Sequence, residues 1–216
     1  MEAAWATGLP VPEVQKAGVW QDRLALLISW LPGRTLEDEL RARPWRMWPL
    51  GIAFGRMQAR MHALPAPALL RQRSDAWIAW QCAGEQALQD RLRHLRSERM
   101  ALLHLDYHLR NVLTDGKHII GIVDWTNALA GDPRADAART VSILHVDPLA
   151  RKPVLVWPGL HIFEHSWRIG YQREGGRLKD MALFYAWAGT VIQHDLAPRY
   201  KHTPNELASA RRWTDK

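Results

Sequence analysis

The chain has 216 residues, of which 47% are hydrophobic and 24% are charged, and its formal net charge is +7. This composition is typical of a soluble globular protein and excludes an intrinsically disordered one. The apolar runs are far too short to cross a bilayer, and the first residues lack the basic and apolar stretches of a signal peptide. A single cysteine, Cys82, excludes an internal disulfide bond, so we expect a cytoplasmic protein without membrane association.

The positive charge is concentrated in residues 41–100, which contain eleven arginines and four acidic residues. The rest of the chain is balanced, with 18 basic and 18 acidic residues. A basic segment can bind phosphates or nucleic acid. Within residues 91–99, however, Leu92 and Leu95 recur at helical spacing, which indicates a helix with one buried face and a solvated arginine-rich face. Because no known nucleic-acid-binding motif accompanies this segment, we do not expect nucleic acid as a partner.

Turn residues divide the first 33 residues into short segments. A brief helical stretch opens the chain and ends in a turn at residues 8–10. The apolar run at 24–28 lies between turn signals, and this pattern predicts a buried strand.

Three helices are predicted between residues 34 and 100. Residues 35–38 resemble a capping box, which predicts a helix from there to just before Pro44. A second helix is predicted at 48–63. Residues 74–75 can cap a long third helix, whose apolar positions keep roughly helical spacing: Trp77, Trp80, Leu88, Leu92 and Leu95.

The pattern changes after residue 100. Two β-like segments, 102–113 and 119–125, flank the sequence Thr-Asp-Gly-Lys at 114–117, which is typical of a hairpin. The sequence thus predicts an α+β fold, with a mostly helical body that holds one hairpin. Beyond residue 133 helical periodicity returns, with predicted helices near 134–145, 160–172, 178–194 and 205–213.

The residues that can carry chemistry lie in and around this hairpin. His104 is followed by Asp106 and, five residues later, by Asn111, and Asp124 ends the apolar strand beyond them. This is the layout of a kinase catalytic loop, H-x-D-x-x-x-x-N, followed across a hairpin by a metal-binding aspartate. Phosphoryl transfer needs a carboxylate beside the attacking hydroxyl and oxygen ligands that hold Mg²⁺ against the nucleotide phosphates. Asp106 can supply the carboxylate, and Asn111 with Asp124 can supply the ligands.

Each of these residues also has a common structural role. Asp106 and Asn111 are ordinary turn residues, and an aspartate at the end of a strand usually only terminates it. A buried histidine such as His104 is more often hydrogen-bonded to the backbone than used as an acid or base. The interpretation therefore depends on the combination of these polar residues at these spacings in hydrophobic surroundings.

The same stretch resembles the aminoglycoside phosphotransferase family, a kinase-like group that includes choline kinase-like enzymes. The resemblance rests on HLDYHLRNVL at 104–113, on IVDW at 122–125 and on GDP with a further aspartate within 131–136. Upstream, LPVPEV at 9–14 and LLISWLPGRTL at 26–36 look like the family's segment that leads into the hinge between the lobes.

This resemblance implies a protein-kinase-like fold of two lobes, with a truncated N-terminal lobe and a mostly helical C-terminal lobe. Residues 1–33 would be the remnant of the N-terminal lobe and the hinge. Residues 34–216 would form the C-terminal lobe, with the catalytic loop and hairpin at 104–125.

The resemblance also implies roles for single residues. Asp106 matches the catalytic base, and Asn111 and Asp124 match the Mg²⁺ ligands. The hinge backbone that would hold the adenine ring matches a run of three residues: Ser29, Trp30 and Leu31.

The chain departs from the family at its start. The family's first strands carry a loop that covers the phosphates and a lysine that grips them, whereas Lys16 is the only lysine before Asp106 and lies too late for that strand. No glycine-rich phosphate loop is present, and Leu105 stands where the family's loop has glycine. The chain is a fragment of a longer kinase, a shortened enzyme, or a relative that only binds a ligand. We hypothesise that Arg34 or an arginine from 41–60 partly replaces the lysine.

Together these patterns predict an ATP- or GTP-dependent phosphotransferase that acts on a hydroxyl of a small molecule, with Mg²⁺ as cofactor. The alternative is a non-catalytic, kinase-like binding module. A remote alternative is a zinc hydrolase, because His161, Glu164 and His165 match the H-x-x-E-H pattern. The sequence predicts neither the acceptor nor the oligomeric state.

Overall fold

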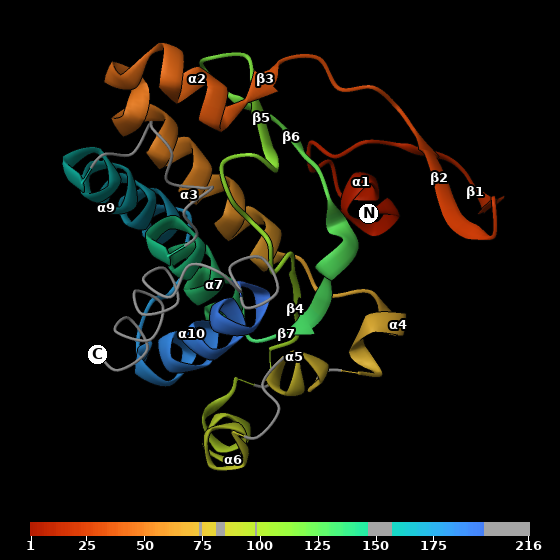
Figure 1. Ribbon diagram of the computed structural model, residues 1–216, viewed down its shortest axis with the longest axis vertical. Helices are drawn as coiled ribbons and strands as arrows, with labels where there is room; N and C mark the ends of the chain where they lie inside the picture. Colours follow the sequence, from red (N-terminus) through yellow and green to blue (C-terminus); the bar gives the residue numbers. More distant parts are fainter. Residues whose placement is uncertain (74, 81–84, 98, 147–156, 197–216) are drawn as a thin grey trace.

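The computed structural model describes residues 1–73, 75–80, 85–97, 99–146 and 157–196. Figure 1 shows a body of helices, with short strands along one side and a hairpin that projects from it. The strands of the described residues form small sheets in the orders β1–β2, β3–β5–β6 and β4–β7. This mixture of helices and short strands confirms the predicted α+β class.

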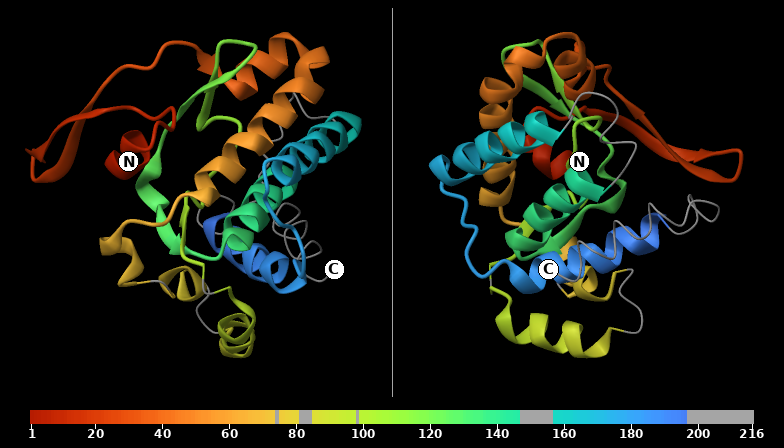
Figure 2. Two further views of the ribbon diagram at one scale, coloured as in Figure 1. Left: turned by 180° about the vertical axis from the view of Figure 1, so that it is seen from behind. Right: turned by 60° about the vertical axis from the view of Figure 1, so that its left-hand side comes forward.

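The N-terminal part consists of a short helix and a hairpin: α1 (Glu2–Ala6), β1 (Val14–Trp20) and β2 (Arg23–Ile28). The predicted strand at 24–28 is therefore present, but its predicted burial is wrong, because Leu24 is 92% exposed. Val19 lies opposite Leu24 on one face of the hairpin, and Trp20 lies opposite Arg23 on the other. Figure 2 shows why both faces stay open: the hairpin extends away from the helices, so no second layer covers it within the described residues.

The next segment confirms two predicted helices. The side-chain oxygen of Thr35 accepts a hydrogen bond from the Asp38 N–H at 3.1 Å, which is the expected capping interaction. The helix predicted at 48–63 begins one residue earlier than expected. The chain runs in order through β3 (Arg34–Thr35), α2 (Leu36–Ala42), the 3₁₀ turn η1 (Pro44–Arg46) and α3 (Met47–Ala63).

The prediction of one long helix from residue 74 is wrong. Trp80, which follows α5, has an extended backbone. The Asp75 side chain does not cap α5 and instead forms an ion pair with Arg96 at 3.1 Å. Trp77 is fully buried with its ring edge-on to Trp187, 5.1 Å between centroids, so packing against the C-terminal helix overrides the helical periodicity. Two short helices lie in its place, α5 (Ala76–Ala79) and α6 (Gln86–Leu95), and a third, α4 (Ala68–Arg71), precedes residue 74.

The hairpin predicted around residues 114–117 is confirmed. Val112 pairs with Ile122 and Thr114 with Ile119 in an antiparallel register. Gly116 has a φ of +94° in the turn, a conformation that glycine adopts without strain. The predicted β-like segment 102–113 is strand only at its two ends. The elements here are β4 (Ala101–Leu103), β5 (Val112–Thr114), β6 (Ile119–Ile122), the 3₁₀ turn η2 (Trp125–Asn127) and β7 (Leu129–Gly131).

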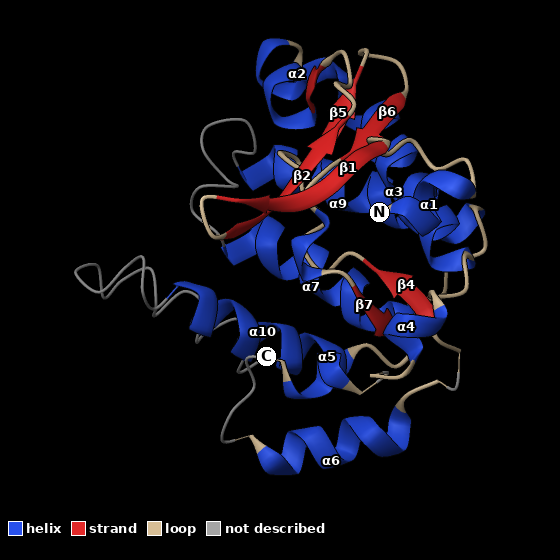
Figure 3. Ribbon diagram, turned by 90° about the vertical axis from the view of Figure 1, so that its right-hand side faces the viewer, coloured by secondary structure: helices blue, strands red, loops and turns tan. Residues whose placement is uncertain are grey.

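Three long helices complete the body at the predicted positions: α7 (Pro133–Val146), α9 (Trp157–Arg173) and α10 (Ala182–Leu196). The helix predicted at 205–213 lies outside the described residues. Figure 3 shows α10 in the lower half of the molecule, with α5 beside it and α6 beneath both. Within the described ranges, no helix is both long enough and apolar enough to cross a membrane.

Helices α3 and α9 pack so closely that glycine is required at their contact. A Cβ added to Gly55 would collide with the carbonyl oxygen of Trp167, and one added to Gly170 would collide with that of Ile52. The indole N–H of Trp167 donates to the buried side-chain oxygen of Gln58 at 2.8 Å, which satisfies the polar atoms at this contact. Helix α3 also contacts the loop that follows β4, since the hydroxyl of Tyr107 donates to the carbonyl of Phe54 at 2.9 Å.

Candidate active site

The loop at 104–111 connects β4 to β5, and a side chain of α7 fixes its start by hydrogen bonds. The buried carboxylate of Asp136 accepts hydrogen bonds from the backbone N–H groups of His104, at 3.2 Å, and Leu105, at 2.7 Å. Its Oδ2 also lies 2.8 Å from Nε2 of His62. The other ring nitrogen of His62 is hydrogen-bonded to the hydroxyl of Tyr171. Burial would raise the pKa of Asp136, but the hydrogen bond and charge of His62 outweigh it and lower the pKa below 3.8. An ionised carboxylate therefore fixes the start of the loop.

His104 ties the loop to the strand that leads to Asp124. Its Nδ1 accepts the N–H of Asp106 at 3.3 Å, so its Nε2 carries the proton and donates to the carbonyl of Val123 at 3.0 Å. Burial lowers the pKa of His104, which keeps the ring neutral, as these two bonds require. The role of His104 is therefore structural, as expected from the sequence.

Asp106 and Asn111 lie in direct contact. The side-chain amide of Asn111 donates to both the carbonyl oxygen and Oδ2 of Asp106, each at 3.0 Å. Nε2 of His108 lies 3.6 Å from Oδ1, and the side chain of Asp106 is 26% exposed. Burial would raise the pKa of Asp106, but the hydrogen bond and charge of His108, with the charge of Arg139, lower it below 3.8. Asp106 is thus an ionised carboxylate that a small molecule can reach.

Asp124 lies two residues after the end of β6, next to the last residue of the loop. The N–H of Val123 donates to the carbonyl of Asn111 at 2.9 Å, which joins the end of the loop to the residue before Asp124. Asp124 is exposed with a left-handed backbone, φ 60° and ψ 66°, and its Oδ1 accepts from the Thr126 hydroxyl at 2.8 Å. Backbone hydrogen bonds therefore connect the segments that carry all three predicted chemical residues.

Two residues of this site were missed in the sequence-based prediction. His108 lies beside Asp106, and its place in the quoted motif is a signal that could have identified it. Arg139 is buried in α7, and its Nε donates to the carbonyl of Leu105 at 3.3 Å. Nothing in the local pattern around Arg139 indicates this contact, because the two segments meet only in the folded chain.

The predicted hinge residues have different surroundings. The N–H of Ser29 donates to the carbonyl of Glu13, and its hydroxyl accepts the N–H of Glu13, both at 2.9 Å. Leu31 packs against Gly121 of β6, whereas Trp30 is 90% exposed. Among the described residues the backbone N–H groups of Trp30 and Leu31 form no hydrogen bond, so these two donors are available.

The arginines that could replace the missing lysine form ion pairs elsewhere. Arg34, Arg43 and Arg46 surround Glu39, and Arg41 pairs with Glu37. Farther along, Arg56 and Arg60 contact Glu174. Lys16 is exposed on β1. These contacts give the replacement hypothesis no support, because every one of these arginines is held by an acidic residue of α2 or by Glu174.

The residues of the zinc-like pattern do not form a ligand set. Glu164 accepts from His145 at 2.6 Å and from Arg168, also at 2.6 Å. His161 and His165 are exposed on α9. Within the described part of the chain, no group of three or more His, Cys, Asp or Glu side chains could hold a metal ion. The zinc hydrolase therefore gains no support.

Comparisons with known proteins agree with the family resemblance. The model of the phosphotransferase enzyme family matches residues 1–168. No curated protein matches the sequence. Among solved structures, a putative aminoglycoside phosphotransferase from Ralstonia eutropha JMP134 is similar, with a TM-score of 0.65 and 20% sequence identity. That match covers 99% of this chain and 78% of the other.

Two further solved structures have the same fold. An amicoumacin kinase in complex with AMP-PNP, Ca²⁺ and Ami matches with a TM-score of 0.64 and 16% identity, over 99% of this chain and 73% of the other. A choline/ethanolamine kinase family protein from Mesorhizobium loti matches with a TM-score of 0.59 and 14% identity, over 100% and 76%. These likenesses confirm the kinase-like fold, and the small sheets fit a truncated N-terminal lobe. The division at residue 33 stays a prediction. Since the family model covers most of its length, the chain belongs to the phosphotransferase enzyme family.

Proposed function

We propose that the chain transfers the terminal phosphate of ATP or GTP to a hydroxyl group of a small molecule. The observation that carries this proposal is the contact between Asp106 and Asn111, in a loop that backbone hydrogen bonds join to the residue before Asp124. This arrangement would let a general base and oxygen ligands act on the same phosphate group, as phosphoryl transfer requires. Solved structures of similar fold support it, since one is a complex with AMP-PNP and another a complex with ADP and hygromycin B.

Asp106 orients the acceptor hydroxyl and receives its proton. Asn111 and His108 fix the carboxylate by their contacts with its oxygens, and its lowered pKa keeps it ionised at neutral pH. As the hydroxyl oxygen bonds to the γ-phosphorus, the bond from phosphorus to the nucleotide's leaving oxygen breaks and the hydroxyl proton passes to Asp106. Because a carboxylate of low pKa is a weak base, orientation of the hydroxyl is the larger part of its contribution.

Asn111 and Asp124 suit a Mg²⁺ ion. The Asn111 side chain uses its nitrogen to donate to Asp106, so its amide oxygen is left for another partner. Asp124 is exposed, and its Oδ2 has no hydrogen bond within the described residues. Hard oxygen donors of this kind are the ligands that Mg²⁺ prefers. When bound, the ion would neutralise charge on the nucleotide phosphates.

The hinge would hold the nucleotide base through its backbone. The N–H groups of Trp30 and Leu31 are the available donors, and Leu31 is fixed by its contact with Gly121. Ser29, whose N–H already binds Glu13, anchors the hinge to the hairpin.

Calorimetry of Mg·ATP and Mg·GTP tests the nucleotide site, with Asp124→Asn as the variant and Asp180→Asn as its control. Asp180 is also exposed and left-handed, at φ 55°, but it lies outside the site, so the control matches Asp124 in backbone conformation. We expect at least a tenfold loss of affinity in Asp124→Asn and none in Asp180→Asn. Equal affinity in all three proteins would contradict the proposed metal ligand.

A screen of hydroxyl acceptors then tests the reaction itself. Asp106→Asn keeps the shape of the side chain and should slow phosphate transfer by about 10²–10⁴-fold while nucleotide affinity is retained. If the wild type binds Mg·ATP but transfers phosphate to no acceptor, the chain is instead a non-catalytic binding module.

A further inference from the structure

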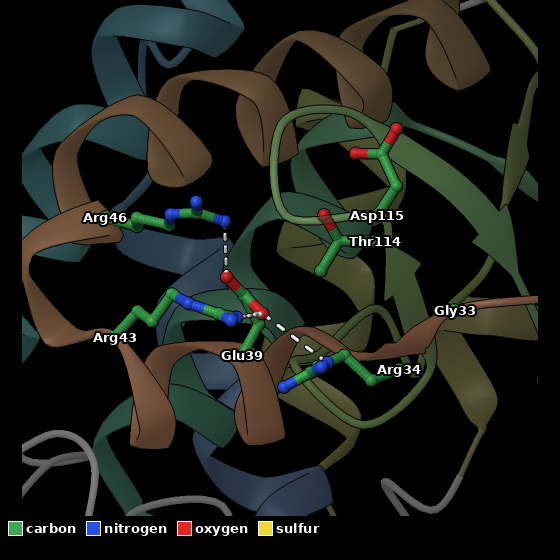
Figure 4. Close-up of a pocket in the computed structure, with 7 residues that line it drawn as sticks. All are labelled: Gly33, Arg34, Glu39, Arg43, Arg46, Thr114 and Asp115. Atoms are coloured by element: carbon green, nitrogen blue, oxygen red, sulfur yellow. Dashed lines mark hydrogen bonds and ion pairs between the residues drawn. The ribbon is translucent and has the colours of Figure 1, made fainter.

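A cavity lies apart from the loop at 104–111, between α2, η1 and the turn after β5. Its volume is about 510 Å³, within the range of small-molecule sites. None of its lining residues belongs to the loop at 104–111 or to the hinge residues 29–31 (Figure 4). The lining consists of Gly33, Arg34, Glu39, Arg43, Arg46, Thr114 and Asp115.

Three arginines converge on one carboxylate in this cavity. Oε1 of Glu39 accepts from Nη1 of Arg46 at 2.6 Å, and Oε2 accepts from Nη1 of Arg43 at 2.8 Å. Nε of Arg34 lies 3.5 Å from Oε2. The Glu39 side chain is only 1% exposed, whereas the side chains of all three arginines are 31% to 50% exposed. Figure 4 shows the three side chains reaching Glu39 from different sides.

The charges of this cluster do not balance. Three guanidinium groups against the Glu39 carboxylate leave two positive charges. Asp115 also lines the cavity and keeps its negative charge, but its carboxylate accepts from the backbone N–H groups of Lys117 and His118 in its own turn and forms no ion pair with the three arginines within the described residues. In Figure 4 the Asp115 carboxylate points away from the arginines. Mutual repulsion of the guanidinium groups would be relieved by a bound dianion.

The backbone holds the cluster in place. The carbonyl of Gly116 accepts a second hydrogen bond from Nη1 of Arg46 at 2.7 Å. A Cβ on Gly116 would collide with that same guanidinium group, and Gly33, at φ +103°, has no room for one either. The buried Glu39 and these glycines therefore preorganise the arginines before any ligand arrives.

We propose that this cavity binds a phosphate group, either as free phosphate or as the phosphate of a small monoester. A phosphate monoester carries close to two negative charges at pH 7, which matches the excess of the cluster, and its oxygens suit the planar donors of arginine. Beyond their bonds to Glu39 and Gly116, the three guanidinium groups have no hydrogen bond within the described residues, so further N–H donors are available. The cavity includes none of the residues of the nucleotide site proposed above.

The test is a titration of ¹⁵N-labelled protein with inorganic phosphate at constant ionic strength, followed through the Nε–H resonances of Arg34, Arg43 and Arg46. Because the signals report from the cavity itself, phosphate in the nucleotide cleft does not interfere. The variants are Arg43→Gln and Arg34→Gln. The control is Arg71→Gln, an exposed arginine of α4 whose side chain has no hydrogen bond in the described ranges.

We expect saturable shifts in the wild type and in Arg71→Gln, with affinity reduced about five- to tenfold in each cluster variant. Shifts that rise linearly without saturation, or equal affinity in Arg43→Gln and the wild type, would overturn the proposal. Melting curves check that the variants fold. Should Arg43→Gln unfold, Arg34→Gln decides the question, because the contact of Arg34 with Glu39 is the longest of the three and its loss disturbs the fold least.

A second titration with glycerol 3-phosphate distinguishes the two sources of the phosphate. If glycerol 3-phosphate binds more tightly than inorganic phosphate, the site is one for a monoester. If it binds more weakly, the site is one for free phosphate. Absence of saturable shifts with both compounds would again overturn the proposal.

Discussion

Leu105 has an unusual combination of properties for a side chain of its size. It is fully buried, yet its φ is +60°, the left-handed region in which a Cβ costs about 1–2 kcal/mol. Its N–H donates to Asp136, and its carbonyl accepts from Arg139, so the strained conformation is held from both sides. Burial of the leucine side chain therefore offsets the cost of its backbone conformation.

This balance predicts that Leu105→Gly is less destabilising than Leu105→Ala, the reverse of the usual order of stability. Leu105→Ala leaves a cavity and keeps the strain, and should lower the free energy of unfolding by about 3 kcal/mol. Leu105→Gly removes the strain as well, and should be more stable than Leu105→Ala by about 1 kcal/mol. Urea unfolding measures both. Leu103, buried in β4, is the matched control, where glycine should be the worse replacement.

A second prediction at this scale concerns pH. Burial would raise the pKa of Glu164, but the hydrogen bonds from His145 and Arg168 outweigh it and lower the pKa from 4.5 to about 2. A carboxylate with a lowered pKa stabilises the fold above its unfolded pKa, and this contribution is lost as pH falls through the folded pKa. The stability difference between wild type and Glu164→Gln should thus be full at pH 7 and shrink between about pH 4.5 and pH 2. Urea unfolding at several pH values measures this difference, with Glu85→Gln, at an exposed position, as the control. A constant difference across the range would contradict the assignment.

At the scale of elements, the α3–α9 contact decides the packing of the body. Alanine normally favours a helix over glycine by about 1 kcal/mol. At Gly55 and Gly170 this preference should be reversed, because a methyl group would collide with a backbone carbonyl of the facing helix. We expect Gly55→Ala and Gly170→Ala each to destabilise the protein by about 3 kcal/mol or more, measured as a lower midpoint of unfolding.

The control for this prediction is Gly18→Ala in β1, where an added Cβ meets no atom within 4 Å. That substitution should change stability by less than about 0.5 kcal/mol. If Gly55→Ala were equally neutral, α3 and α9 would not pack as closely as described.

Elements fixed by neighbouring residues could be predicted from the sequence, and those fixed by distant residues could not. The cap at Thr35 and the turn at 114–117 depend on side chains within three or four positions, and both are confirmed. The end of α5 at Ala79 accompanies the packing of Trp77 against Trp187, which no local pattern contains. In the site, the spacing of Asp106 and Asn111 is local, whereas the contribution of Arg139 comes from another helix.

At the scale of the whole molecule, stability is unevenly distributed. The helical body encloses the core, whereas the β1–β2 hairpin exposes apolar side chains on both faces. A two-stranded hairpin without a covering layer is marginally stable in water. Local opening of the hairpin should therefore cost far less free energy than unfolding of the body.

Hydrogen exchange tests this uneven stability. The amides of β1 and β2 should exchange at least 100-fold faster than those in the middle of α3, which exchange only when the body unfolds. Slow exchange in the hairpin would contradict this expectation and would show that another chain covers it, which sedimentation at several concentrations would detect.

The carboxylate of Asp136 has one more consequence, for the newly made chain. The backbone of His104 and Leu105 is fixed by a residue that is synthesised about thirty positions later. The loop at 104–111 therefore cannot adopt its folded geometry when it first leaves the ribosome. That geometry forms only after α7 has been synthesised and has packed against the loop, so a chain stalled before α7 contains the loop sequence without the folded conformation of the loop.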